Sequence, residues 1–209
     1  MRMTYLRATR AAALGCSGGP SAVTPPSINA GSAASSAMEL YDKNSDGAIA
    51  GEELAAAPAL KAAMETLDVN KDGSVQEEEI VQRIEAWQKS NAGLSTIAAV
   101  VTMNGQPLEG ATVTFDPEPF LGEGMKQAVG VTSRLGGVSP IIPKENRPDP
   151  SWPAGLQLGL YRVRVSKQAN GAETIPAIYN TETTLGQQVS PDDATIGANR
   201  VKFDLKSGK

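Results

Sequence analysis

Histidine is absent from the 209-residue sequence, and cysteine occurs once, at Cys16. Without histidine there can be no Ser–His–Asp triad, no His-ligated zinc and no imidazole acting as a general base near neutral pH. A single cysteine excludes an intrachain disulfide and a thiolate metal cluster. Most of the familiar catalytic constellations are therefore excluded, and we expect a protein that is not an enzyme.

Aromatic side chains and long apolar runs are also scarce. Aromatic residues make up 4% of the chain, whereas it contains 21 glycines and 14 prolines. No apolar run approaches the ~18 residues of a membrane-spanning helix, so we expect no transmembrane segment. We also expect part of the chain to be linker, because small and polar residues bury too little surface to form a core.

Acidic residues are concentrated in one segment of the sequence. Between Glu39 and Lys89, twelve acidic residues stand against five basic ones, although the whole chain has a net charge of only −4. This segment would repel a phosphate backbone, and no basic cluster occurs elsewhere, so a nucleic-acid partner is not expected. The gathered carboxylates favour a cation-binding site instead.

The N-terminal residues carry a pattern associated with export. Arg2, Arg7 and Arg10 precede a short apolar stretch that ends in Ala13-Leu14-Gly15-Cys16. This run resembles a bacterial lipobox, which implies that residues 1–16 are a lipoprotein-type signal and that Cys16 is lipidated. The protein would then be exported and held in the cell envelope, touching the membrane only through its anchor. The alternative interpretation is a plain cytosolic leader.

Residues 17–36 consist largely of Ser, Ala, Gly and Pro. Such a composition cannot offset the conformational entropy lost on folding. It predicts a disordered tether between Cys16 and the first folded domain.

One spacing pattern occurs twice: Asp-x-Asn-x-Asp-Gly, followed by five residues and Glu. It covers residues 42–53, hereafter the first loop, and residues 68–79, the second loop. This is the pattern of the EF-hand, whose loop surrounds a calcium ion with about six to eight oxygen atoms. We therefore predict two calcium ions, with ligands from Asp42, Asn44, Asp46, Glu53 and the Ala48 carbonyl, and from Asp68, Asn70, Asp72, Gln76, Glu79 and the Ser74 carbonyl.

Two further features support this prediction. Gly47 and Gly73 stand at the sixth position, where the turn needs a positive φ. Ile49 and Val75 stand at the eighth position, where paired loops form a short two-stranded contact. The alternatives are a solvated acidic turn and an EF-hand that no longer binds calcium.

The flanks of both loops predict helices within a domain spanning residues 37–90. We expect a short turn at 38–41, a helix from Pro58 to Leu67, and a helix over residues 77–90 in which apolar residues recur at helical spacing. Calcium sensors expose a methionine-rich groove, and only Met38 and Met64 are available here, so a structural role is favoured.

From residue 94 to residue 207 the pattern changes to alternating β segments. Asn104-Gly105 is a hairpin signal, and buried-face residues alternate with polar ones around Val113, Val163 and Phe203. The segments 101–113 and 159–165 resemble the opening hairpin and a later strand of carboxypeptidase-regulatory-like, transthyretin-like domains. This resemblance implies an antiparallel β-sandwich without an active site, here interrupted by a Pro-rich excursion.

Other acidic and aromatic residues are assigned no catalytic role. Trp152 is interpreted as a cap on the core or, alternatively, as a stacking surface for a sugar or peptide. The acids interpreted as solvated loop residues are Asp116, Glu118, Glu123, Asp192 and Asp193.

Together these patterns predict an α + β multidomain protein: a compact helical EF-hand pair followed by an antiparallel β-sandwich. The arrangement resembles small bacterial envelope lipoproteins of unassigned role. The expected function is a calcium-binding, exported structural or interaction module, with an envelope protein or polysaccharide as partner. The alternative is a calcium-responsive regulator whose EF-hands alter partner binding by the sandwich.

Overall fold

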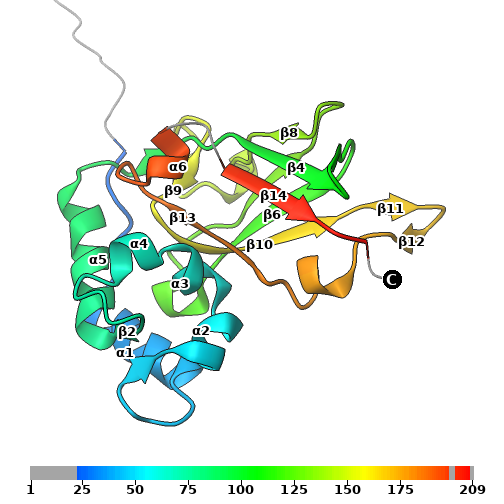
Figure 1. The fold of residues 1–209 in the computed structure, drawn as a ribbon. Helices are drawn as coiled ribbons and strands as arrows, with labels where there is room; N and C mark the ends of the chain where they lie inside the picture. Colours follow the sequence, from blue (N-terminus) through cyan, green and yellow to red (C-terminus); the bar gives the residue numbers. More distant parts are fainter. Residues whose placement is uncertain (1–22, 198–200, 208–209) are drawn as a thin grey trace, which may run out of the picture.

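The computed structural model describes residues 23–197 and 201–207. It contains both helices and antiparallel sheets, which confirms the α + β class. The helices between residues 30 and 89 gather at one end of the molecule, and the larger sheets lie at the other end together with the short helix at residues 194–197 (Figure 1). Cys16, with the rest of the predicted signal and the start of the predicted tether, lies outside the described residues. None of the described helices is long and apolar enough to cross a membrane.

The helical part consists of short helices and two-residue strands. Its elements are α1 (Ala30–Tyr41), β1 (Ala48–Ile49), α2 (Gly51–Ala56), α3 (Pro58–Ala62), α4 (Met64–Leu67), β2 (Val75–Gln76) and α5 (Glu77–Lys89). The α5 helix matches the predicted one, and its apolar face is buried. The helix predicted from Pro58 is divided at Ala63 into α3 and α4.

Helix α1 begins well before the short turn that the sequence predicts. The side chain of Asn29 caps it by accepting a hydrogen bond from the N–H of Ser32 at 2.9 Å. Ala33, Ala34 and Ala37 are buried, because their small side chains allow α1 to pack closely against α5. The prediction of a disordered tether is therefore wrong from residue 30 onward: a neighbouring helix buries residues that could not form a core by themselves.

The remaining elements are mostly strands. They are β3 (Leu94–Ser95), β4 (Ala99–Met103), β5 (Gln106–Pro107), β6 (Thr112–Pro117), η1 (Pro119–Leu121), β7 (Ala128–Val131), β8 (Gly137–Val138), η2 (Lys144–Asn146), β9 (Leu156–Gln157), β10 (Gly159–Ser166), β11 (Gln168–Ala169), β12 (Ala172–Glu173), η3 (Ala177–Tyr179), β13 (Leu185–Val189), α6 (Ala194–Gly197) and β14 (Val201–Leu205). The β11–β12 hairpin projects away from the sheets (Figure 1).

One sheet is antiparallel throughout, with the strand order β13-β10-β6-β7. The predicted alternation is confirmed on its two central strands. Thr114 of β6 is only partly buried between the fully buried Val113 and Phe115, and Arg162 of β10 is only partly buried between the fully buried Tyr161 and Val163. The inner face of this sheet therefore supplies one wall of the core.

The second sheet has the order β14-β4-β5, and β8 also pairs with β4. The predicted turn at Asn104-Gly105 is confirmed, with φ values of 52° and 80°. Strand β14 runs parallel to β4, so the fully antiparallel prediction is wrong for this pair. Strands β4 and β14 lie far apart in the chain, so no tight hairpin obliges them to run antiparallel.

Aromatic side chains join the two sheets. The ring of Phe115 lies 6.0 Å from that of Tyr161 in its own sheet and 6.2 Å from that of Phe203 in β14 of the other sheet. Edge-to-face contacts at these distances are favourable beyond the area they bury. The sheets consequently share one core.

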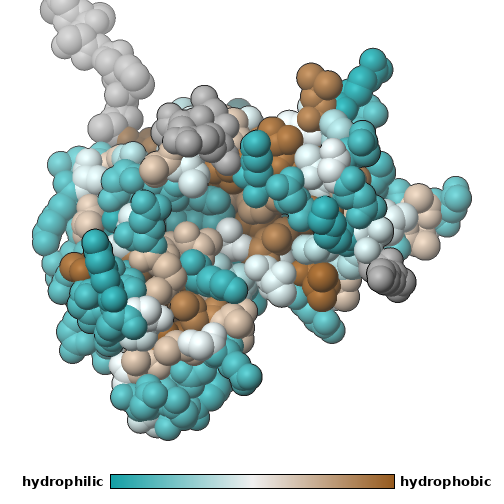
Figure 2. Space-filling model, in the orientation of Figure 1, coloured by the Kyte–Doolittle hydropathy of each residue, from teal (hydrophilic) through white to brown (hydrophobic). Residues whose placement is uncertain are grey.

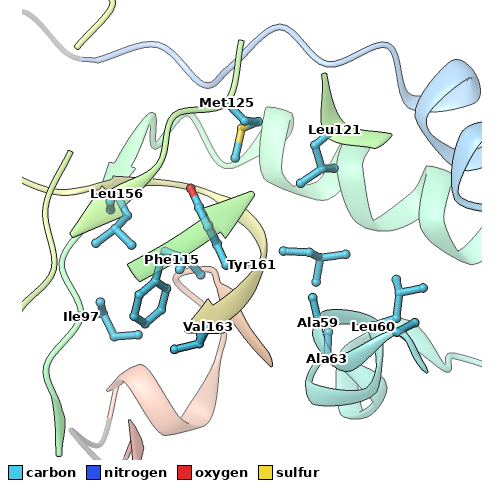
Figure 3. Close-up of a cluster of buried hydrophobic side chains, with 14 of the residues drawn as sticks. Ala59, Leu60, Ala63, Ile97, Phe115, Leu121, Met125, Leu156, Tyr161 and Val163 are labelled. Atoms are coloured by element: carbon cyan, nitrogen blue, oxygen red, sulfur yellow. The ribbon is translucent and has the colours of Figure 1, made fainter. Parts of the chain in front are cut away.

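The helical part packs directly onto this core. Ala59 and Leu60 of α3 are fully buried and extend the cluster that contains Phe115 and Tyr161 (Figure 3). At Gly186 of β13, an added Cβ atom would lie 1.9 Å from the carbonyl oxygen of Pro58. Helix α3 can therefore approach β13 closely only because residue 186 has no side chain.

Candidate metal centre

The structure places the two predicted loops side by side at the helical end of the molecule. The first loop joins α1 to α2, and the second joins α4 to α5. Strands β1 and β2, one from each loop, pair antiparallel and bring Ile49 opposite Val75. Both of these side chains are fully buried, so the predicted contact between the eighth positions is confirmed. Hydrophilic surface covers the lower end of the helical part, around α2 (Figure 2).

The backbones of the two loops bend in the same way over their first six positions, and Gly51 (51°), at the tenth position of the first loop, is the one further residue with a positive φ in either loop. Positive φ values occur at Ser45 (60°) and Gly47 (88°) in the first loop, and at Lys71 (61°) and Gly73 (84°) in the second. An added Cβ atom at either glycine would meet no atom within 4 Å, so space is not what requires glycine. Glycine is favoured at these two positions by the left-handed backbone conformation, in which a residue with a side chain is strained.

In the first loop, the carboxylates and the asparagine amide accept hydrogen bonds from the loop's own backbone. Asp42 accepts from the N–H groups of Asp46 (3.2 Å) and Gly47 (3.0 Å). Asn44 Oδ1 accepts from the N–H of Asp46 at 2.8 Å, and Asp46 Oδ1 from the N–H of Ala48 at 3.0 Å. The predicted ligands of this loop are thus turned toward one another by its backbone.

Glu53 ties the end of the first loop to its beginning. Its Oε1 atom accepts from the N–H groups of Lys43 (2.8 Å) and Asn44 (3.1 Å), and its Oε2 atom accepts from the N–H of Ala50 (3.4 Å). Both carboxylate oxygens therefore face the loop.

The second loop repeats this arrangement position by position. Asp68 accepts from the N–H groups of Asp72 (3.1 Å) and Gly73 (2.9 Å). Glu79 accepts from the N–H groups of Val69 and Asn70 through Oε1, at 2.9 and 3.4 Å, and from that of Gln76 through Oε2, at 3.1 Å. Equivalent residues of the two loops thus play equivalent parts.

Ser74 and Gln76 add side-chain contacts that the first loop lacks. Gln76 Nε2 donates to Asp72 Oδ2 at 2.7 Å and to Ser74 Oγ at 2.8 Å. Hydrogen bonds from the hydroxyl and the N–H of Ser74 lower the pKa of Asp72 to about 2. This carboxylate therefore remains charged at every physiological pH.

The donor set of each loop fits calcium by its chemistry. Every predicted ligand atom is a carboxylate, amide or carbonyl oxygen, which is the donor that calcium prefers. Across the described ranges, no three or more His, Cys, Asp or Glu side chains stand close enough together to hold an ion unaided. A calcium ion would therefore also depend on Asn44, Asn70 and the carbonyls of Ala48 and Ser74.

The interpretation of the remaining acids as solvated is wrong for Glu118. Its side chain is fully buried after β6, where Oε2 accepts a hydrogen bond from the hydroxyl of Tyr41 at 2.8 Å. Arg162 Nε lies 3.9 Å from the same oxygen. Tyr41 is the last residue of α1 and directly precedes the first predicted ligand, so Glu118 connects the first loop to the sheets.

The other acids divide between bound and exposed. Asp116 pairs with Arg164, and Asp192 pairs with Arg83 at 2.7 Å. Asp193 is buried and caps α6 by accepting from the N–H of Thr195 at 2.8 Å. Among the five acids predicted to be solvated, only Glu123 is exposed and has a side chain that makes no hydrogen bond or ion pair with the described residues; its backbone carbonyl accepts a hydrogen bond from Lys126.

Trp152 is half-buried in the loop that precedes β9, and its backbone carbonyl accepts a hydrogen bond from Arg147 at 2.8 Å.

No known protein-family model matches the sequence, and comparison with curated proteins finds no significant relative. Function is therefore inferred from the geometry of the two loops.

Proposed function

We propose that the protein binds two calcium ions, one in each loop, as an EF-hand pair. The observation that carries this proposal is the repetition of one hydrogen-bonding arrangement in both loops, around a complete set of oxygen donors. The ligands would be the side chains of Asp42, Asn44, Asp46 and Glu53 with the Ala48 carbonyl, and those of Asp68, Asn70, Asp72, Gln76 and Glu79 with the Ser74 carbonyl.

Bound calcium would act mainly by stabilising the fold. Each ion offsets the repulsion between the carboxylates of its loop. At a calcium concentration of ~100 times the dissociation constant, binding adds about 2.7 kcal/mol per site to the free energy of unfolding.

A structural or interaction role is favoured over a sensor role. Sensors open to expose an apolar groove between their helices. Here Leu60, Leu67 and Ile84, which lie on three different helices, are fully buried against the rest of the chain. A regulator would have to break these contacts to open.

We further propose that this module works in the bacterial cell envelope, exported and held by a lipid on Cys16. Its sheets would form a β-sandwich similar to carboxypeptidase-regulatory-like, transthyretin-like domains, with an envelope protein or polysaccharide as partner. This part of the proposal rests on the sequence resemblances alone.

Calorimetric titration of metal-free protein with calcium tests the proposal. The wild type should take up two ions, Glu53→Gln and Glu79→Gln one each, and the double variant none. Glu52→Gln and Glu78→Gln are matched controls, because they remove the same charge from neighbouring exposed residues. If these controls lose as much binding as the ligand variants, the acidic segment attracts calcium without specific sites, and the proposal fails.

A further inference from the structure

A buried glutamine of the sheet contacts both helices that flank the second loop. Gln188, on β13, is 1% exposed. Its Oε1 atom accepts a hydrogen bond from Arg83 Nε at 2.9 Å and lies 3.1 Å from the hydroxyl of Thr66, whose single proton is shared with the Ala63 carbonyl at 3.0 Å. Because an arginine can only donate, this contact identifies the amide oxygen as the atom that faces the helices.

The two donors stand close to the ends of the second loop. Thr66 is on α4, two residues before the predicted ligand Asp68, and Arg83 is on α5, one helical turn after the predicted ligand Glu79. Glu79 and Arg83 are each 6% exposed and lie on the same side of α5. A single oxygen atom is therefore in contact both with the helix that enters the loop and with the helix that leaves it.

Arg83 is itself held in place by three further contacts. Its Nη1 and Nη2 atoms donate to the two carboxylate oxygens of Asp192 at 2.8 and 2.7 Å, and its guanidinium lies 5.7 Å from the ring centre of Trp87. A bidentate arginine–carboxylate pair restricts orientation as well as distance. The bond to Gln188 therefore joins β13 to a side chain that cannot easily move.

The first loop lacks an equivalent arrangement. Its entering helix, α1, is bonded to the sheet part through Tyr41 and Glu118. Its exit helix, α2, lies entirely within the described residues and contains no buried residue. The two sides of the first loop therefore share no common polar contact of this kind, whereas both sides of the second loop meet at Gln188.

We propose that Gln188 is a positioning residue for calcium at the second loop, and that this loop is consequently the tighter of the two sites. The inference rests on the proposed calcium binding. A site whose flanking helices are already fixed loses less conformational freedom when it binds its ligand. Residues that hold metal ligands without touching the metal typically change affinity by about 10–100-fold when replaced.

The experiment measures each site separately by calorimetry. Glu53→Gln leaves the second loop intact, and Glu79→Gln leaves the first. Adding Gln188→Met, which keeps the volume but removes the acceptor, should weaken calcium binding about tenfold in the Glu53→Gln background. In the Glu79→Gln background the same change should have less than about a threefold effect, because within the part of the chain that the structure describes the Gln188 side chain bonds to α4 and α5 and not to α1 or α2.

Gln187→Met is the matched control. Gln187 is the adjacent buried glutamine, and its amide bonds to the Gln188 carbonyl and to Asp193 rather than to α4 or α5. It should leave both affinities unchanged. Thr66→Val is a second variant that removes one of the two donors. If Gln188→Met loses its near-UV circular dichroism and is therefore misfolded, the calcium affinities of Thr66→Val test the proposed positioning in its place.

Equal effects of Gln188→Met on the two loops, or equal effects of Gln188→Met and Gln187→Met, would overturn the inference while leaving calcium binding intact. Absence of calcium uptake by the wild type would overturn the proposed function and this inference with it. Loss confined to the second loop is the result that supports positioning by Gln188.

Discussion

At the scale of single residues, the two loops are organised by carboxylates that accept hydrogen bonds from their own backbone. Glu53 and Glu79 each join the start of a loop to its end. The same oxygen atoms are the ones that a calcium ion would need. The backbone thus orients the predicted ligands, and an ion would add charge neutralisation.

Glu118 shows how a buried residue makes stability depend on pH. Burial raises the pKa of its carboxyl above the ordinary 4.5, although the hydrogen bond from Tyr41 and the charge of Arg162 act in the opposite direction. The folded protein therefore keeps this proton to a higher pH than the unfolded chain does. The stability that this residue contributes is complete below the unfolded pKa and is lost as the pH rises through the folded pKa.

We predict that Glu118→Gln removes this dependence. The free energy of unfolding of the wild type, relative to that of the variant, should decrease as the pH rises from below 4.5 toward neutrality. Urea unfolding of both proteins in the presence of a chelator measures the difference, and the loop carboxylates cancel because both proteins contain them. A difference that stays constant or increases with pH would contradict the assignment.

At the scale of secondary-structure elements, helix α3 packs closely against strand β13 and joins the two parts of the molecule. Gly186 allows it, because the space that a Cβ atom would occupy is filled by the backbone of Pro58. Helix α3 cannot move away without exposing Ala59 and Leu60, which are fully buried.

Gly186→Ala should therefore separate α3 from β13 and lower the free energy of unfolding by about 1–3 kcal/mol, the usual effect of overpacking. Gly124→Ala is the control, since its Cβ would meet no atom within 4 Å and its φ is not positive. The control should change stability by less than about 0.5 kcal/mol in the same denaturant experiment. Equal effects of the two substitutions would show that α3 does not pack as described.

The sequence predicted the elements whose pattern is local. Loop spacing located both candidate sites, and period-two alternation located the strands around Val113, Val163 and Phe203. Helix α1 was largely missed because its buried face consists of three alanines and, at its last residue, Tyr41, and alanines become core residues only when α5 covers them. The parallel pairing of β14 with β4 was missed because a strand's residues do not record its direction relative to a distant partner.

The contacts that connect the two parts could not be predicted from any pattern. Glu118 and Gln188 look like ordinary loop and strand residues in the sequence. Their partners, Tyr41 and Arg83, are 77 and 105 positions away. Only the folded chain brings these groups together.

At the scale of the whole molecule, the helical part and the sheets share a continuous set of buried side chains. Buried polar contacts at Tyr41 and Arg83 cross the same boundary. Opening either part alone would leave apolar surface exposed and charged groups unpaired. We therefore expect the described chain to unfold as one unit.

Trp152→Phe tests this expectation. The chain has two tryptophans, and this substitution leaves Trp87 of α5 as the only one. Unfolding followed by Trp87 fluorescence and by far-UV circular dichroism should give the same midpoint. Calcium should raise both midpoints together. A Trp87 transition that precedes the circular dichroism transition, or that alone responds to calcium, would show two independent domains.

The central claim is that both loops bind calcium, and native mass spectrometry of metal-free protein with added calcium tests it most directly because it counts bound ions. We predict two ions on the wild type, one on Glu53→Gln, one on Glu79→Gln and two on the Glu52→Gln control. A wild type that carries no calcium at concentrations that saturate other calcium-binding proteins would contradict the account. The two loops would then be backbone turns stabilised by their own carboxylates.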